Sequence, residues 1–176
     1  MNMDKLTTRS KQALIEAQEL TTQSQHSEVL PTHLLLVLID DREGPVRALL
    51  QKLDTNLTEL RRSVSQTLEK RPRVSGTAYE PRLSQALLQT MQLGLNEAKH
   101  FRDEYISQDT LLLAMLKQDD AELRRLFRKA NLTYDNALQS LVSIRGTPRA
   151  DDPDAEGRFQ VLDQYCRDLT QQARDG

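Results

Sequence analysis

The sequence reads PTHLLLVLID at residues 31–40 and QDTLLLAMLK at residues 108–117. The two stretches align at an offset of 77 residues, so their Leu-Leu-Leu runs coincide. Three flanking residues agree at the same offset: Arg47 with Arg124, Leu49 with Leu126 and Lys52 with Lys129. Agreement outside the leucine runs predicts an internal duplication of the chain.

The opening helix of each copy shows a second match. Gln12-Ala13-Leu14 agrees with Gln85-Ala86-Leu87 at an offset of 73 residues. Four residues are about one helical turn, so we expect the shorter offset to change a helix's length without rotating its buried face. The first repeat then covers about residues 6–71 and the second about residues 79–145.

Helical spacing of leucines, with few interruptions, predicts an all-α fold. The chain has 6 Gly and 6 Pro among 176 residues, and only 4% of its residues are aromatic. The first helix is expected from about Thr8 to Gln23, and two four-helix bundles are expected to pack about a pseudo-twofold axis. The other helices are expected to begin at or just after these residues: Pro31, Gly44-Pro45, Asn56, Pro81, Ser107, Asp119-Asp120 and Thr133.

The chain changes character after the duplicated region, which ends near residue 146. Residues 147–154, TPRADDPD, contain two Pro and three Asp and predict an extended, solvated linker. A further amphipathic helix is expected over about residues 155–176. Its apolar stripe has nothing in its own segment to cover it, which predicts that the polypeptide continues past Gly176. The stripe consists of Phe159, Leu162, Tyr165, Cys166 and Leu169.

Composition excludes several classes of protein. The 24 basic and 26 acidic residues give a net charge of −2, which argues against nucleic-acid binding. The longest apolar run, Leu34–Ile39, is far shorter than the roughly 20 residues of a membrane span. Cys166 is the single cysteine and cannot form an internal disulfide. The first residues lack the apolar core of a signal peptide, so we expect a soluble, cytoplasmic chain.

Signatures of enzymes are missing from the sequence. The six glycines form neither a phosphate-binding loop nor a dinucleotide fingerprint. The histidines at 26, 33 and 100 are never four residues apart and have no cysteine nearby, so a zinc site is not expected. We therefore expect a non-catalytic chain without a metal or cofactor of its own. The seam between the two bundles is expected to form a binding groove.

Three polar residues, Thr7, Asp103 and Asp109, stand at or just before expected helix starts, where backbone N–H groups lack intrahelical partners. An acid at the position of Asp109 can also stabilise the N-terminus of its own helix, so placement alone does not assign a function to it.

The duplicated pattern resembles the Clp amino-terminal domain, a double four-helix repeat at the front of Clp and heat-shock AAA+ unfoldases. Four segments carry this resemblance: Leu6-Thr7-Thr8-Arg9, Pro31-Thr32-His33-Leu34-Leu35, Tyr79-Glu80-Pro81-Arg82 and Tyr105-Ile106-Ser107-Gln108-Asp109-Thr110-Leu111. The tail, at Ala155-Glu156, residues 162–170 and residues 173–176, is similar to the stretch that leads into the first ATPase module of ClpB-type disaggregases.

The resemblance implies a domain that captures apolar segments of unfolded or aggregated proteins and passes them to the pore of a hexamer. ATP and Mg²⁺ would then belong to a module outside this chain, and the isolated chain would be a monomer. Thr7, Asp103 and Asp109 match positions tied to client handling in the family, and Leu93 matches the apolar lining of its groove. Two alternatives are docking of adaptor proteins and the N domain of a secretion-associated Clp ATPase that recognises one defined helix.

Overall fold

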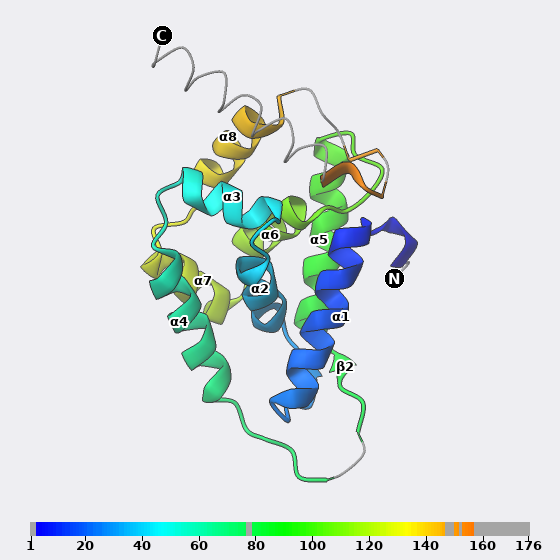
Figure 1. Ribbon diagram of the computed structural model, residues 1–176, viewed down its shortest axis with the longest axis vertical. Coiled ribbons are helices and arrows are strands. Elements are labelled where there is room, and N and C mark those ends of the chain that lie inside the picture. The colour runs from blue at the N-terminus through cyan, green and yellow to red at the C-terminus, as the bar shows by residue number, and fades with distance from the viewer. Residues whose placement is uncertain (1–2, 77–78, 147–149, 152, 157–176) are drawn as a thin grey trace.

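The computed structural model describes residues 3–76, 79–146, 150, 151 and 153–156. Within these residues the chain is built of α-helices and one small parallel sheet, so the predicted all-α class is confirmed (Figure 1). The elements in chain order are the 3-10 turn η1 Met3–Lys5, α1 Thr8–Gln23, β1 Glu28–Val29, α2 Pro31–Asp40, α3 Pro45–Lys52, α4 Leu57–Glu69, β2 Arg82–Leu83, α5 Gln85–His100, α6 Gln108–Lys117, α7 Ala121–Lys129 and α8 Tyr134–Arg145.

Side-chain caps fix where most of these helices begin. A side-chain oxygen accepts a hydrogen bond from a backbone N–H of the first turn, which otherwise has no intrahelical partner. Residues that cap in this way are Thr7, Asn56, Ser84, Asp120 and Thr133. The helices α2 and α3 begin instead with Pro31 and Pro45, because the first helical position needs no N–H.

The helices of the two halves correspond at one offset throughout. Helices α1 and α5 have 16 residues each and begin 77 positions apart, and α2 and α6 have 10 residues each at the same offset. The offset of 73 expected for the opening helix is therefore wrong. The sequences agree at 73 because a shift of about one helical turn leaves the apolar stripe on the same face. The buried positions of α1, however, recur in α5 at an offset of 77 residues.

The expected start of α5 at Pro81 is also wrong. Ser84 accepts a hydrogen bond from the Leu87 N–H and caps the helix, so α5 begins at Gln85. The preceding residues Arg82 and Leu83 are extended because they pair with Glu28 and Val29 as a short parallel sheet. Proline at 81 therefore precedes a strand, not a helix.

Two backbone pairings join the repeats. Val29 pairs with Leu83 in the small sheet, and Leu6 pairs with Ile106 in an isolated parallel bridge. An offset of 77 turns Leu6 into Leu83 and Val29 into Ile106, so each pairing is the symmetry mate of the other. This exchange is the signature of an isologous, pseudo-twofold interface within one chain.

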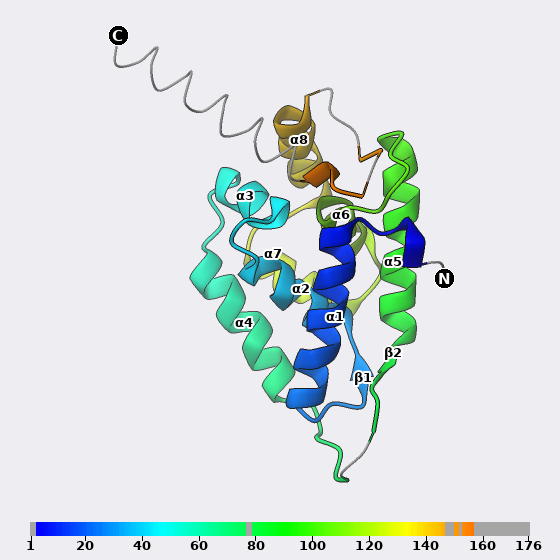
Figure 2. The same ribbon diagram turned by 45° about the vertical axis from the view of Figure 1, so that its right-hand side comes forward.

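The core is centred on helices α2 and α6, which lie between the other helices (Figures 1 and 2). Eight of the ten residues of each helix are buried, including both leucine runs. Helix α5 packs closely against α6 because Gly94 has no side chain: a Cβ there would lie 3.2 Å from both Ile106 Cγ2 and Leu111 Cδ2.

We predict that Gly94→Leu lowers the free energy of unfolding by about 1–3 kcal/mol, because the new side chain overpacks this contact. Urea unfolding followed by circular dichroism would measure the loss. The matched control is Gln92→Leu, at an exposed position of the same helix, with an expected effect within about 0.5 kcal/mol. Equal effects of the two substitutions would contradict the close packing of α5 on α6.

A buried histidine pair lies at the start of α2. His26 Nδ1 and His33 Nε2 are 2.8 Å apart, and His33 Nδ1 accepts the Leu30 N–H at 2.9 Å. Burial, aided by the neighbouring His26 and Arg71, lowers the pKa of His33 to about 4. The symmetry-related Thr110 accepts the Ser107 N–H at 3.0 Å, so threonine can perform the same capping role.

We predict that His33 alone contributes a loss of about 2 kcal/mol of stability as the pH falls from 6.5 toward 4, because the unfolded chain binds protons that folded His33 does not. The His33→Thr variant keeps a cap and removes this titration, so its stability should depend less steeply on pH. Thermal unfolding across this pH range would compare the two slopes. Identical slopes would show that His33 is not held neutral by the fold.

The predicted linker and C-terminal helix are described only in part. Among the described residues of this region, Ala150, Ala155 and Glu156 are buried, whereas Asp151, Pro153 and Asp154 are exposed. Ala150, Pro153 and Glu156 contact the helical body, unlike a fully solvated linker. They accept hydrogen bonds from N–H groups at the starts of α1 and α6 and in the loop before α6. The predicted apolar stripe from Phe159 to Leu169 lies outside the described residues.

Candidate functional site

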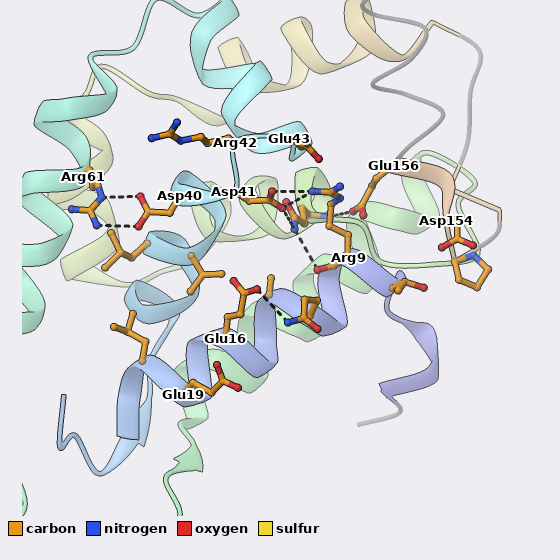
Figure 3. Close-up of a pocket in the computed structure, with 18 of the residues that line it drawn as sticks. Arg9, Glu16, Glu19, Asp40, Asp41, Arg42, Glu43, Arg61, Asp154 and Glu156 are labelled. Atoms are coloured by element: carbon orange, nitrogen blue, oxygen red, sulfur yellow. Dashed lines mark hydrogen bonds and ion pairs between the residues drawn. The ribbon is translucent and has the colours of Figure 1, made fainter. Parts of the chain in front are cut away.

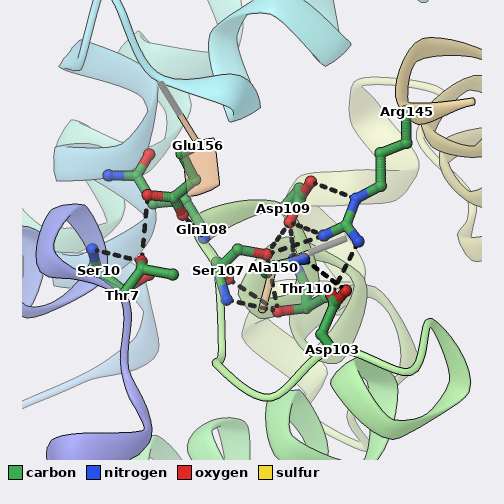
Figure 4. Close-up of polar contacts among 10 residues, drawn as sticks. All are labelled: Thr7, Ser10, Asp103, Ser107, Gln108, Asp109, Thr110, Arg145, Ala150 and Glu156. Carbon is green, nitrogen blue, oxygen red and sulfur yellow. Dashed lines mark hydrogen bonds and ion pairs between the residues drawn. The ribbon is translucent and has the colours of Figure 1, made fainter. Parts of the chain in front are cut away.

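A buried arginine joins two of the predicted site residues. Arg145, the last residue of α8, has only 3% of its surface exposed. Its guanidinium donates to Asp103 Oδ2 at 2.8 Å and to the two carboxylate oxygens of Asp109 at 2.9 and 3.1 Å (Figure 4). Asp103 lies in the loop after α5, and Asp109 lies in the first turn of α6.

The surroundings of Arg145 keep it charged. Burial alone would lower its pKa, but the charges and hydrogen bonds of Asp109 and Asp103 raise the pKa of the guanidinium overall. The Phe101 ring adds a cation–π contact, with its centroid 4.5 Å from Cζ of Arg145. A buried arginine with two carboxylates and an aromatic face is a rigid structural centre, because each partner would be costly to leave unpaired.

Asp109 also organises the start of α6. Its Oδ1 accepts the Thr110 N–H at 2.8 Å and a hydrogen bond from the Ser107 hydroxyl. Ser107 Oγ in turn accepts a hydrogen bond from Arg145 at 3.0 Å. The first turn of α6 is therefore locked to the end of α8 by side chains that are almost completely buried.

A second carboxylate, Glu156, lies on the other side of this turn. Its Oε1 accepts the backbone N–H of Gln108 at 2.5 Å, and its Oε2 accepts a hydrogen bond from the Thr7 hydroxyl at 3.1 Å (Figure 4). Thr7 is the cap of α1, so Glu156 bridges the N-termini of α1 and α6. Burial, with a smaller contribution from nearby Asp109, raises the pKa of Glu156 to about 7.

Backbone groups around Glu156 make further contacts with the body. We call the described residues Ala150, Asp151 and 153–156 the strap. The Ala150 carbonyl accepts the N–H groups of Glu104 and Tyr105, both at 3.0 Å, and its own N–H donates to Asp103 Oδ1 at 2.8 Å. The Pro153 carbonyl accepts the Thr8 N–H at 3.0 Å. The strap thus contacts Thr7 through Glu156 and Asp103 through Ala150.

A cleft of about 1000 Å³ adjoins the strap and runs along α1, the end of α2 and part of α4 (Figure 3). Charged residues form much of its wall, where Arg9 pairs with Asp41 at 2.8 Å and Arg61 pairs with Asp40 at 2.7 Å. The strap contributes Pro153, Asp154 and Glu156 to the lining. Its apolar lining residues are Ala13, Leu20, Leu36 and Val37.

The structure brings three of the four predicted site residues together. Thr7, Asp103 and Asp109 are at most 8% exposed and meet in one polar cluster. Leu93 lies elsewhere, on α5, partly exposed and not among the residues that line the cleft. One turn from Leu93, buried Glu97 accepts a hydrogen bond from the Tyr134 hydroxyl at 2.8 Å, so a polar contact occupies this side of α5.

The partners of these residues, Arg145 and Glu156, are not among the residues predicted from the sequence. Arg145 follows Leu138 and Leu141 at helical spacing, so it stands on an apolar stripe, and an arginine there is a signal for a buried ion pair. Glu156 has no such signal in its own segment. One of its partners is the backbone N–H of Gln108, 48 residues away. Almost every residue type has a backbone N–H, so the sequence does not reveal this donor.

Comparison with known proteins gives the family. The model of the Clp repeat (R) N-terminal domain matches residues 5–130, which is well over half of the chain. The chain belongs to the Clp N-terminal domain family. The match spans both repeats as far as α7, and it confirms the resemblance seen in the sequence.

Relatives of this Clp N-terminal domain include two bacterial chaperone proteins ClpB. The one from Bacillus cereus is 31% identical over 179 residues, and the one from Vibrio vulnificus is 34% identical over 176 residues. Both alignments cover 100% of this chain, which spans only about a fifth of each relative: 21% and 20%. The chain is therefore homologous to the N-terminal region of ClpB.

Solved structures share the fold. The Hsp104 N-terminal domain from Candida albicans superposes with a TM-score of 0.76 at 25% identity, over 86% of this chain and 99% of that one. The N-domain of ClpV from Vibrio cholerae superposes with a TM-score of 0.68 at 23% identity, over 80% of this chain and 84% of that one. A ClpV N-domain in complex with a VipB peptide has a TM-score of 0.63, over 79% of this chain and 86% of that one.

Two other features, a metal cluster and a membrane-spanning helix, are absent from the described residues. No cluster of three or more His, Cys, Asp or Glu side chains within them could hold a metal ion. None of the helices in the described part of this Clp N-terminal domain has the length and apolar character needed to cross a bilayer.

We predict that Arg145→Met lowers the free energy of unfolding by about 3–5 kcal/mol, because it leaves Asp103 and Asp109 buried without a cation. The difference from wild type should narrow at pH 4, because burial raises the pKa of Asp103 and its carboxyl can take up a proton once the arginine is removed. Urea unfolding at pH 7 and pH 4 would measure both effects. The exposed Arg128→Met in α7 is the control, and an equally small loss for Arg145→Met would contradict this role.

Proposed function

We propose that this Clp N-terminal domain is the client-recognition module of a ClpB-type disaggregase. It binds apolar segments of unfolded or aggregated polypeptides and presents them to an ATP-driven homohexamer in the cytoplasm. ATP and Mg²⁺ would act in the part of the relatives that this chain does not span. The chain itself would be monomeric and would bind without catalysing a reaction.

One observation carries this proposal. The whole chain aligns with the N-terminal fifth of ClpB chaperones, including the residues after the second repeat. A likeness confined to the helical repeats would fit several kinds of Clp N domain equally. The alignment beyond residue 146 therefore supports the disaggregase over the other members of the family.

The cleft along α1 is the client surface that we favour. Its apolar lining offers contact area to aliphatic side chains, and its length along α1 suits an extended or helical segment. Leu93 on α5 would add a separate apolar contact. Thr7, Asp103 and Asp109 are buried, and each contacts the strap or Arg145. We therefore propose that they act on client handling by holding the backbone in place, without touching the client.

Charge at the cleft favours one class of client. Arg9 and Arg61 are neutralised by Asp41 and Asp40. The acids Glu16, Glu19 and Glu43 have no ion-pair partner among the described residues, against one similarly unpaired arginine, Arg42. We therefore propose that the favoured clients are apolar segments flanked by Lys or Arg.

A second candidate function is docking of one defined partner helix, as an adaptor or the partner of a secretion-associated Clp ATPase would offer. A charged wall around a modest apolar floor supports this candidate, because charges select register and partner more than they add affinity. The two functions differ in selectivity. A defined partner would outcompete generic unfolded clients, whereas a general client site would bind many sequences with micromolar or weaker affinity.

We predict that the triple variant Glu16→Gln/Glu19→Gln/Glu43→Gln weakens binding of a lysine-flanked leucine peptide about threefold to tenfold at low salt. The same peptide with glutamine in place of lysine should bind both proteins alike. NMR titration would measure affinity and map the shifts, which are expected at Leu20, Leu36 and Val37.

The control removes three exposed carboxylates that do not line the cleft, at Glu69, Glu80 and Glu104. It should bind the peptide as wild type does. Absence of shifts from either peptide would refute client binding at this cleft, and tight binding of a single helix with inert generic clients would favour the second candidate.

A further inference from the structure

The strap supplies acceptors to four N–H groups of the body. The Thr8 N–H donates to Pro153, those of Glu104 and Tyr105 donate to Ala150, and that of Gln108 donates to Glu156. Thr8 and Gln108 are the first residues of α1 and α6, whose N–H groups have no intrahelical acceptor. The strap therefore completes the hydrogen bonding of two helix starts.

The anchoring side chain is enclosed by its site. Glu156 is 3% exposed, and both of its carboxyl oxygens have partners, one on Gln108 and one on Thr7. Ala150 and Ala155 on either side of the exposed Pro153 and Asp154 are fully buried. The buried Ala155 side chain, the Pro153 carbonyl and the Glu156 carboxyl thus all contact the helical body.

We propose that the N-termini of α1 and α6 form a binding site for the protonated carboxyl group of Glu156 of this chain, and that its occupation docks the strap on the helical body. Thr7 and Asp103 are positioning residues for the strap: Thr7 contacts the Glu156 carboxyl, and Asp103 accepts the Ala150 N–H. Asp109 and Arg145 hold the α6 start that carries the Gln108 donor. This inference goes beyond the proposed function and does not depend on client binding.

The charges facing Glu156 come from several elements. Arg9 on α1 favours its ionised form, and Asp109 on α6 disfavours it. Asp41, the C-cap of α2, pairs with Arg9 and accepts a hydrogen bond from the Gln108 side chain, which tempers the attraction of Arg9. Arg145 on α8 is engaged by Asp103 and Asp109. The balance favours a docked carboxyl that carries a proton.

Docking should therefore depend on pH. The docked state retains a proton that the released strap loses, so docking is strongest below the ordinary pKa of glutamate. It weakens as the pH rises toward 7, the pKa of docked Glu156. Protection of the four N–H groups is expected to be about tenfold greater at pH 5.5 than at pH 8.

The test is amide hydrogen exchange by NMR on the 176-residue chain, read as protection factors so that the intrinsic rates cancel. In wild type, the amides of Thr8, Glu104, Tyr105 and Gln108 should be protected at pH 5.5. Glu156→Ala should reduce that protection at least tenfold. The exposed Glu69→Ala in α4 is the matched control and should leave all four amides unchanged.

Two further readouts keep the result interpretable. The amides of Thr7 and Ile106 donate within the body, to Ile106 and Lys5, so their protection reports folding apart from the strap. Glu156→Gln keeps an acceptor oxygen without a titrating proton, so it should retain docking and lose the pH dependence. Protection of the four amides that survives Glu156→Ala would overturn the proposal. The same would follow if these amides were unprotected in wild type while those of Thr7 and Ile106 stay protected.

Discussion

The bridge between Leu6 and Ile106 sets the geometry on which the candidate site depends. Its two hydrogen bonds, from Thr7 to Ile106 and from Ile106 to Lys5, hold the segments before α1 and α6 side by side. The N-termini of the two helices consequently point into one small volume. The strap uses donors that this backbone pairing has brought together, since Glu156 accepts from both Thr7 and Gln108.

Burying three charged groups at such a place costs desolvation free energy, and the arrangement repays that cost with dense hydrogen bonding. Arg145 donates to two carboxylates and one hydroxyl. A cluster of this kind is weak evidence for extra stability, because well-packed apolar residues could serve as well. Its physical effect is to allow one arrangement of α8, the loop after α5 and the α6 start.

Local signals predicted most of the fold. Caps such as Asn56 and Thr133, and proline at the first position of α2, act within one turn, so the residue types alone reveal them. The failures came where tertiary contacts decide. Pro81 was predicted to start a helix because the pairing of Leu83 with Val29 leaves no signal in the local sequence. The opening helices were aligned at an offset of 73 because a shift of one helical turn preserves the apolar periodicity.

The site was only partly predictable for a related reason. Polar residues before helices flagged Thr7, Asp103 and Asp109, but their partners lie 36 to 149 residues away. The seam between the repeats was expected to hold the groove. A small pocket does lie between residues of α4 and α7 from the two repeats, whereas the cleft of about 1000 Å³ follows α1 and the end of α2 and is bordered by the strap. Which seam positions are filled depends on side-chain volumes across the interface, and no single segment encodes them.

The pseudo-twofold axis relates Gln108 to Pro31, and this one difference has a broad effect. Gln108 offers its backbone N–H to a carboxylate, whereas the ring nitrogen of proline has no hydrogen to offer. The neighbouring pair differs as well, with Asp109 in one copy and Thr32 in the other. The start of α2 therefore has no backbone donor equivalent to the Gln108 N–H, and the two symmetry-related corners differ in what they can bind. In a nearly symmetric domain, only the side at the start of α6 can therefore bind a carboxyl group through this backbone N–H.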